Sequence, residues 1–101
     1  MIIVYITCRD EKEAKKISTH LLKKRLIACA NIFPVKSLYW WKNKITEENE
    51  YVIIAKSKRE KFKNIKEQTK NIHSYDVPCI ECWDVADVDK EYLQWIKDET
   101  R

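Results

Sequence analysis

The segment that most limits the possible folds is the first one, residues 2–8, which read IIVYITC. It is apolar on both faces and rich in β-branched residues, a pattern typical of a strand in the middle of a sheet. Asp10 follows as a predicted N-cap, and Glu13 completes a predicted capping box. Apolar residues then recur at helical spacing over residues 11–26, with lysines on the opposite side. The sequence therefore predicts a central strand followed by an amphipathic helix, whose apolar stripe needs a sheet to cover.

The next part of the chain predicts a β-hairpin. Residues 28–41 alternate as a strand does, and Pro34 marks an edge, a bulge or a bend there because proline cannot donate to a ladder. Asn43 is the residue best able to adopt positive φ in the turn at residues 42–44, since the chain contains no glycine. Residues 45–57 are expected to return as the antiparallel partner.

A second helix, a fourth strand and a last helix complete the order of elements. Ser57 and Glu60 predict a second capping box at the start of the next helix. Residues 79–85 then predict a fourth strand. Asp87 or Asp89 is expected to cap a short C-terminal helix.

This order, β-α-β-β-α-β plus a C-terminal helix, is that of the ferredoxin-like split βαβ arrangement. We therefore predict an α+β ferredoxin-like sandwich, built as a single domain over residues 1–101. Two helices would cover one face of the antiparallel sheet and leave the other face bare. The bare face would carry either Tyr39 with Trp41, or Leu38 with Trp40. Because a monomer rarely exposes so much contiguous apolar surface, the sequence predicts an oligomer.

Five ordered segments resemble the CutA family, the divalent-cation tolerance proteins: RLIACANI, SLYWWKNKI, EYVIIAKS, HSYDVPCI and YLQWI. The resemblance covers essentially the whole chain. It implies a ferredoxin-like subunit with an extended central hairpin, in a tight homotrimer whose hairpins reach between subunits. Tyr39, Trp40 and Trp41 would then lie in the subunit interface. The resemblance also implies a link to tolerance of copper and other divalent metals, no established reaction, and a trimer similar to that of the PII signalling proteins.

Two departures from the usual CutA pattern concern charge and metal ligands. The family hairpin commonly reads W-W-E-G-K, whereas this chain has WWKNK, so Lys42 reverses the local charge. The family loop commonly reads H-P-Y-x-V-P-E, whereas this chain has HSYDVPC, which ends in Cys79. A thiol in place of a carboxylate shifts the preference from Mg²⁺ or Ca²⁺ toward soft ions such as Cu(I), unless the position is not a ligand.

The C-x-x-C pair of Cys79 and Cys82 is not a complete metal motif. A structural zinc site needs four ligands, and side chains three apart in a strand point to opposite faces. His73 and Cys79 form a better pair because a loop separates them, and a neighbouring subunit could supply a third ligand. Alternatively, His73 only caps the end of its helix. We predict weak metal binding by His73 and Cys79, with copper or another divalent metal as the sole cofactor.

Other polar residues in the family-like segments suggest a second kind of site. Glu50, Lys56 and Tyr75 either line an intersubunit cleft for a small anion or pair with one another. Nucleic acid is not expected as a partner, because acids interrupt the lysine-rich residues 56–70 and the glycine-dependent pattern of RNA-reading sheets is absent.

No membrane association is expected. The longest apolar run, MIIVYI, is far shorter than a membrane span, and no charged region precedes it as in a signal peptide. The sequence therefore predicts a cytoplasmic protein.

Two functions are compatible with this sequence. The first is a non-enzymatic CutA-like homotrimer that takes part in divalent metal tolerance and the response to copper, and that binds metal weakly. The second is a small-ligand binder or signalling trimer that uses the intersubunit cleft, as PII proteins do.

Overall fold

The computed structural model describes residues 1–101 and shows a four-stranded antiparallel sheet with three helices. The strands are β1 (Ile2–Cys8), β2 (Cys29–Trp41), β3 (Lys44–Ser57) and β4 (Ile80–Asp84). The helices are α1 (Glu11–Lys23), α2 (Phe62–Ile72) and α3 (Lys90–Glu99), with a 3-10 turn at Arg59–Lys61 before α2. The α+β class predicted from the sequence is confirmed. None of the three helices has the length and apolar character that crossing a membrane requires.

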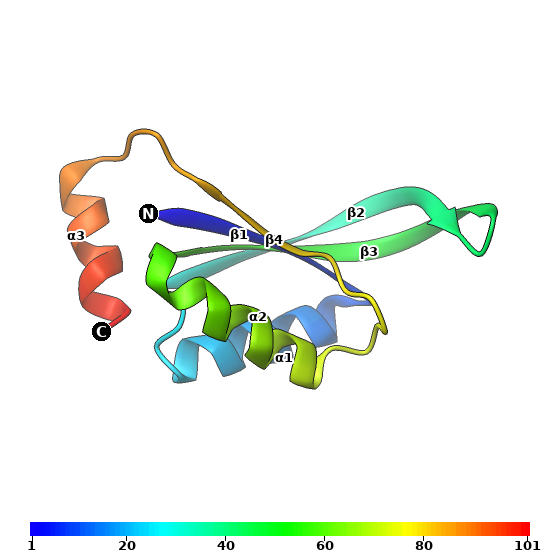
Figure 1. Ribbon diagram of the computed structural model, residues 1–101, viewed down its shortest axis with the longest axis horizontal. Helices are drawn as coiled ribbons and strands as arrows, with labels where there is room; N and C mark the ends of the chain where they lie inside the picture. Colours follow the sequence, from blue (N-terminus) through cyan, green and yellow to red (C-terminus); the bar gives the residue numbers. More distant parts are fainter.

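The sheet has the strand order β2-β3-β1-β4, so the first strand of the chain lies inside the sheet, as its apolar sequence predicts. Helices α1 and α2 lie side by side on one face of this sheet, whereas α3 packs at the end where β1 begins (Figure 1). The core forms between the sheet and the two helices. Its fully buried side chains include Ile2, Val4, Ile6, Ile17, Leu21, Ile53 and Ile65.

The β2–β3 hairpin extends well beyond the two helices (Figure 1). Its tip is a two-residue turn in which Lys42 and Asn43 both have positive φ, 50° and 63°. A turn with two such residues has the twist that joins antiparallel strands without splaying them. Asn43 was expected to adopt this conformation, and the structure confirms it.

Alternation along β2 decides which hairpin side chains share a face. Leu38 and Trp40 continue the face that the helices cover, but they lie beyond the reach of α1 and α2 and are 64% and 71% exposed. Tyr39 and Trp41 lie on the opposite, uncovered face. Ile45, the cross-strand partner of Trp40, is also exposed. The hairpin therefore carries unburied apolar side chains on both of its faces.

Most predicted boundaries hold, with small shifts that have local causes. Helix α1 ends at Lys23 rather than at residue 26, because Arg25 adopts a φ of 58° and turns the chain toward β2. Pro34 lies within β2, which is an edge strand bound only to β3, so its missing N–H breaks no central ladder. Asp89 caps α3 by accepting a hydrogen bond from the backbone N–H of Tyr92 at 3.1 Å.

The second predicted capping box is wrong. The Ser57 hydroxyl is buried and donates to the carbonyl oxygen of Leu26 at 2.6 Å, which ties the end of β3 to the segment after α1. Helix α2 begins after the 3-10 turn, with Lys61 at the N-cap position and no side-chain cap. Ser57 thus makes a long-range hydrogen bond instead of capping the helix, as the local pattern predicted.

The turn conformation of Asn43 predicts a difference between two substitutions. Asn43→Ala is expected to lower the free energy of unfolding by about 1 kcal/mol, because alanine pays the steric penalty of the left-handed region. Asn43→Gly removes the Cβ and is expected to lie within about 0.5 kcal/mol of the native protein. Guanidinium denaturation of the two variants measures this. Equal stability of the alanine and glycine variants would contradict the role assigned to this turn.

Candidate functional site

Three buried side chains from distant parts of the chain meet near the end of β1. Cys8 is the last residue of β1, Glu13 lies in the first turn of α1, and His73 follows α2. Their potential ligand atoms lie within 4.8 Å of one another, and no other three such side chains of this chain converge in this way. Of these three residues, only His73 was predicted from the sequence to be a metal ligand.

Both ring nitrogens of His73 are engaged in hydrogen bonds. Nδ1 accepts a hydrogen bond from the backbone N–H of Tyr75 at 3.1 Å, so it carries no proton. Nε2 lies 2.8 Å from the carbonyl oxygen of Thr7 and therefore donates to it. The side chain is fully buried. His73 is thus a neutral imidazole that must release the Tyr75 amide before it could bind a metal ion.

Both carboxylate oxygens of Glu13 are also engaged. Oε1 accepts from the backbone N–H of Arg9 at 2.9 Å, and Oε2 accepts from the backbone N–H of Ser74 at 2.9 Å. Burial disfavours the charged carboxylate, but the hydrogen bonds from Ser74 and Arg9 outweigh burial and lower the pKa of Glu13. Glu13 is therefore an ionised carboxylate with a hydrogen bond to each oxygen, and it connects the start of α1 to the loop after α2.

Cys8 completes the cluster as a protonated thiol. Burial, and then the charges of Glu13 and Glu50, raise the pKa of Cys8 to about 12. The thiolate, which is the form that binds metals, is therefore scarce at neutral pH. The lone pairs that His73 and Glu13 could offer to a metal ion already accept hydrogen bonds from backbone amides. These three side chains therefore do not fit a metal ion. Their arrangement instead fastens the loop at residues 73–79 to β1 and α1.

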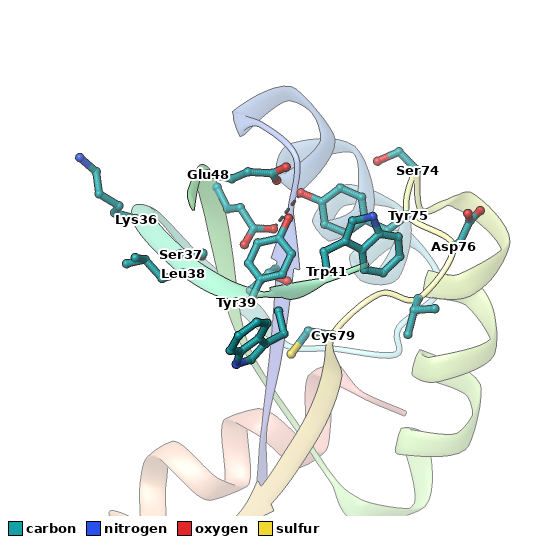
Figure 2. A pocket seen from close by; sticks show the side chains of 14 residues that line it. Lys36, Ser37, Leu38, Tyr39, Trp41, Glu48, Ser74, Tyr75, Asp76 and Cys79 are labelled. Atoms are coloured by element: carbon teal, nitrogen blue, oxygen red, sulfur yellow. Dashed lines mark hydrogen bonds between the residues drawn. The ribbon is translucent and has the colours of Figure 1, made fainter. Parts of the chain in front are cut away.

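A groove lies between this loop and the hairpin, with a volume of about 840 Å³ (Figure 2). We call it the hairpin groove. Its walls come from β1, β2, β3 and the loop before β4. The residues that line it are Thr7, Lys36, Ser37, Leu38, Tyr39, Trp40, Trp41, Glu48, Glu50, Ser74, Tyr75, Asp76, Val77 and Cys79.

Two phenols and two carboxylates meet inside the hairpin groove (Figure 2). The Tyr75 hydroxyl donates to Oε2 of Glu50 at 2.8 Å, and Glu50 is only 6% exposed. Burial, and then the hydrogen bond to Glu50, raise the pKa of Tyr75 far above its ordinary value. Burial and a hydrogen bond to Glu48 likewise raise the pKa of Tyr39. Both phenols therefore stay protonated, and that of Tyr75 donates to Glu50.

The predicted metal ligands His73 and Cys79 occupy different surroundings. Cys79 is exposed and lines the hairpin groove, whereas the His73 side chain is buried behind it. Partial burial and the charges of Glu81 and Glu50 raise the pKa of Cys79, against a hydrogen bond with Thr7 that lowers it. Thr7 lies next to both residues. Its carbonyl oxygen accepts a hydrogen bond from Nε2 of His73, and its hydrogen bond with Cys79 is the one that lowers the pKa of that thiol. Metal binding by the pair stays a prediction.

The three residues predicted to form a cleft do not meet within one chain. Glu50 and Tyr75 are in contact, but Lys56 lies six positions further along β3, about 20 Å away at ~3.3 Å per residue. Nζ of Lys56 lies 3.3 Å from Oδ1 of Asn31 and 5.6 Å from the centre of the Tyr92 ring. Polar residues at two ends of an extended strand cannot share one small site. A cleft between subunits that holds all three stays a prediction.

Tyr39, Trp40 and Trp41 all line the hairpin groove. Trp40 and Trp41 are 71% and 46% exposed, which leaves apolar surface for another subunit to cover. Their place in a subunit interface stays a prediction. Glu48 also lines the groove and was not predicted from the sequence. The period of two along β3 could have found it, because Glu48 shares a strand face with Glu50.

Comparisons with known proteins agree with one another over the whole chain. The family model of the CutA1 divalent ion tolerance protein matches residues 2–99. The divalent-cation tolerance protein CutA of Pyrococcus horikoshii is 46% identical over 101 residues, which are 100% of this chain and 99% of that protein. Its counterpart in Archaeoglobus fulgidus is 44% identical over 97 residues, 96% of this chain and 94% of that protein. A solved structure of the Archaeoglobus protein matches with a TM-score of 0.98 and 40% identity, over 100% of both chains.

These relatives contradict the predicted cytoplasmic location. The solved Archaeoglobus structure is described as that of a periplasmic protein. Protein CutA 1 of Oryza sativa, 32% identical over 99% of this chain and 57% of its own length, is described as chloroplastic. A short apolar segment without a charged leader therefore does not identify the compartment in which such a protein works. The family is nevertheless clear from the match over nearly every residue: the chain belongs to the CutA1 family of divalent ion tolerance proteins.

Proposed function

We propose that this protein acts in tolerance of divalent cations, copper among them, as a homotrimer that binds metal weakly and catalyses no reaction. The observation that carries the proposal is the family match over residues 2–99, since the family is described by ion tolerance and not by a reaction. The strand order β2-β3-β1-β4, with α1 and α2 on one face, supports assignment to the ferredoxin-like class. The exposed apolar hairpin supports assembly into a trimer.

Weak binding follows from the donors that one chain offers. Cys79 presents an exposed thiol, a soft ligand that suits copper better than Mg²⁺ or Ca²⁺. His73 can join it only by giving up its hydrogen bond from Tyr75. Outside the occupied cluster of Cys8, Glu13 and His73, three ligand atoms do not converge in a single chain. We therefore propose that a second subunit completes the coordination.

Calorimetric titration with Cu(I), Cu(II) and Zn²⁺ tests this proposal. We expect saturable heat from copper, and Cys79→Ser is expected to weaken Cu(I) binding by at least about tenfold because it removes the soft ligand. Cys82→Ala is the matched control, since Cys82 packs against the core on the other face of the sheet. His73→Ala shows whether the imidazole takes part, because unchanged heat would exclude it. Absence of saturable heat from all three ions would contradict the proposed metal binding.

A small-ligand function is the second candidate, and the hairpin groove favours it. Its volume of about 840 Å³ lies within the range of small-molecule sites. The related signalling role, similar to that of PII proteins, would require the cleft to form between subunits. A thermal-shift screen of small charged metabolites tests this second function, because a ligand that binds only the folded state raises the melting temperature.

A further inference from the structure

The positive charge of this chain is concentrated on its helical layer. Residues 11–25 and 58–72, which contain α1 and α2, hold 12 of the 20 lysines and arginines but only 4 of the 16 acids. Their formal net charge is therefore +8, whereas the rest of the chain carries −4. The two helices lie side by side on one face of the sheet (Figure 1). The side of the molecule that they form is thus strongly basic, although the net charge of the whole chain is only +4.

The outer side of α1 carries this positive charge as a continuous stripe. The helix buries one side against the rest of the domain, through Glu13, Ala14, Ile17, Ser18 and Leu21. An open hollow of about 420 Å³ runs along its other side. The hollow is lined by four lysines and two further polar residues, with no apolar and no acidic side chain: Lys12, Lys15, Lys16, Thr19, His20 and Lys23. We call these six residues the lysine stripe. From its first to its last lysine it is about 16 Å long, at ~1.5 Å per residue.

Most of these lysines have no acidic partner. Lys15 forms a salt bridge with Glu11 at 2.9 Å. The other three lysines of the stripe are exposed and form no salt bridge. The acids that interrupt residues 56–70 belong to α2 and to the turn before it, not to the stripe. A surface that only keeps a protein in solution carries charges of both signs interspersed, and the lysine stripe lacks the negative ones.

The composition of the lysine stripe favours a chain of phosphate groups as its ligand. Lysine ammonium groups attract phosphate as point charges, without the fork geometry of arginine. A single phosphate ion cannot contact lysines at both ends of a stripe about 16 Å long, so a polymer fits better. The stripe has no aromatic ring on which a base could stack, as surfaces that bind single-stranded nucleic acid have. It also has no apolar side chain that could enter a lipid bilayer.

We propose that the lysine stripe binds linear inorganic polyphosphate, with successive phosphate groups beside Lys12, Lys16 and Lys23. Nε2 of His20 donates to Oε1 of Gln68 at 2.7 Å, which ties the stripe to α2 and fixes the ring beside it. The proposed trimer would form through the exposed hairpin, whereas the stripe lies on the helical side of the molecule. The assembly would therefore leave the stripe open and carry three copies of it. The site does not depend on the metal ligands proposed above.

Calorimetric titration with long-chain sodium polyphosphate, in buffer without divalent cations, tests the proposal. We expect saturable binding, which orthophosphate at the same total phosphate concentration does not show. The triple variant Lys12→Gln, Lys16→Gln and Lys23→Gln keeps good helix formers and is expected to weaken binding by at least about tenfold. The slope of log affinity against log salt concentration is expected to become shallower by about 2, at ~0.7 for each lost contact with a single-chain polyanion. Arginine at the same three positions keeps the charge and is expected to retain binding.

A second triple variant, Lys90→Gln, Lys97→Gln and Arg101→Gln, is the matched control. All three residues are exposed and lie in or next to α3, so the variant changes the net charge equally away from the stripe. It is expected to leave the affinity for polyphosphate nearly unchanged. The proposal is overturned if no saturable binding occurs, or if the two triple variants weaken binding equally. It is also overturned if duplex DNA or phosphatidylserine vesicles bind more tightly than polyphosphate at equal charge, since the ligand would then be nucleic acid or a lipid surface. Metal titration of the same samples bears only on the ion tolerance proposed above.

Discussion

Glu13→Ala is expected to lower the free energy of unfolding by about 2–5 kcal/mol, because it leaves two backbone amides without their acceptors. Those amides belong to Arg9 and Ser74, which are 65 positions apart in the sequence. The loss would free the loop that carries His73 and Tyr75 as well as the start of α1. For a domain of this size, such a change corresponds to a fall in melting temperature on the order of 10 °C or more.

The same carboxylate predicts a dependence on pH. The pKa of Glu13 in the folded protein lies below its unfolded value of about 4.3. Its ionised form therefore contributes stability above that pH, and the contribution is lost as pH falls through the lower, folded pKa. The difference in stability between the native protein and Glu13→Gln is expected to be largest near neutral pH and to shrink below about pH 4.

Guanidinium denaturation at several pH values measures both effects. Glu11→Ala is the matched control, since Glu11 lies in the same turn but is exposed and forms a salt bridge with Lys15 at the surface. The Glu11→Ala substitution is expected to lower the free energy of unfolding by less than about 0.5 kcal/mol. If Glu13→Ala were as mild as Glu11→Ala, or if the Glu13→Gln difference grew at low pH, the anchoring role of Glu13 would be disproved.

Replacing Trp40 with lysine and Ile45 with glutamate is expected to convert the proposed homotrimer into 12.2 kDa monomers. The two side chains are cross-strand partners, 71% and 66% exposed in the single chain. Covering such side chains in an assembly contributes about 1.5–3 kcal/mol for each one. Charged groups in their place would have to be desolvated, which opposes association.

This double variant is designed to leave the hairpin itself intact. Lysine and glutamate at opposed positions attract each other across the two strands, so the register is maintained. Leu22→Lys is the matched control, because Leu22 is an exposed apolar residue of α1, away from the hairpin. Size-exclusion chromatography with light scattering should give about three times the monomer mass for the native protein and the control. A native mass of 12.2 kDa, or an unchanged mass for the double variant, would contradict the trimer.

Local patterns predicted the elements of this fold well because local physics determines them. The buried strand at residues 2–8, the N-cap at Asp10 and the positive φ of Asn43 each depend on neighbouring residues. Pro34, which cannot donate a ladder hydrogen bond, was compatible with an edge, a bulge or a bend, and the structure places it in an edge strand. Where a pattern failed, a distant partner was the cause, as when Ser57 bonded to Leu26 instead of capping a helix.

The candidate site was harder to predict because its contacts join distant segments. Glu13 was correctly identified near a helix start, and its hydrogen bond from Arg9 is local, but its other oxygen accepts from Ser74, which no local pattern includes. Glu50 and Tyr75 are in contact within one chain, whereas Lys56 is separated from them by the extension of β3, so a cleft that holds all three would have to form between subunits. Family-like segments identify residues of interest, but only the strand register shows which of them share a face.

The interior position of β1 has a consequence for how the chain folds during synthesis. Ile2 pairs with Ser57 on one side and with Asp84 on the other, so the first strand made must wait for partners made much later. At ~5–20 residues per second, β4 follows β1 by roughly 4–16 s. The β2–β3 hairpin needs only neighbouring residues and forms within about 1–10 μs once it emerges. Nascent chains are therefore expected to pass through a three-stranded intermediate, in which β1 has joined β3 and its other edge stays open to misassociation until β4 arrives.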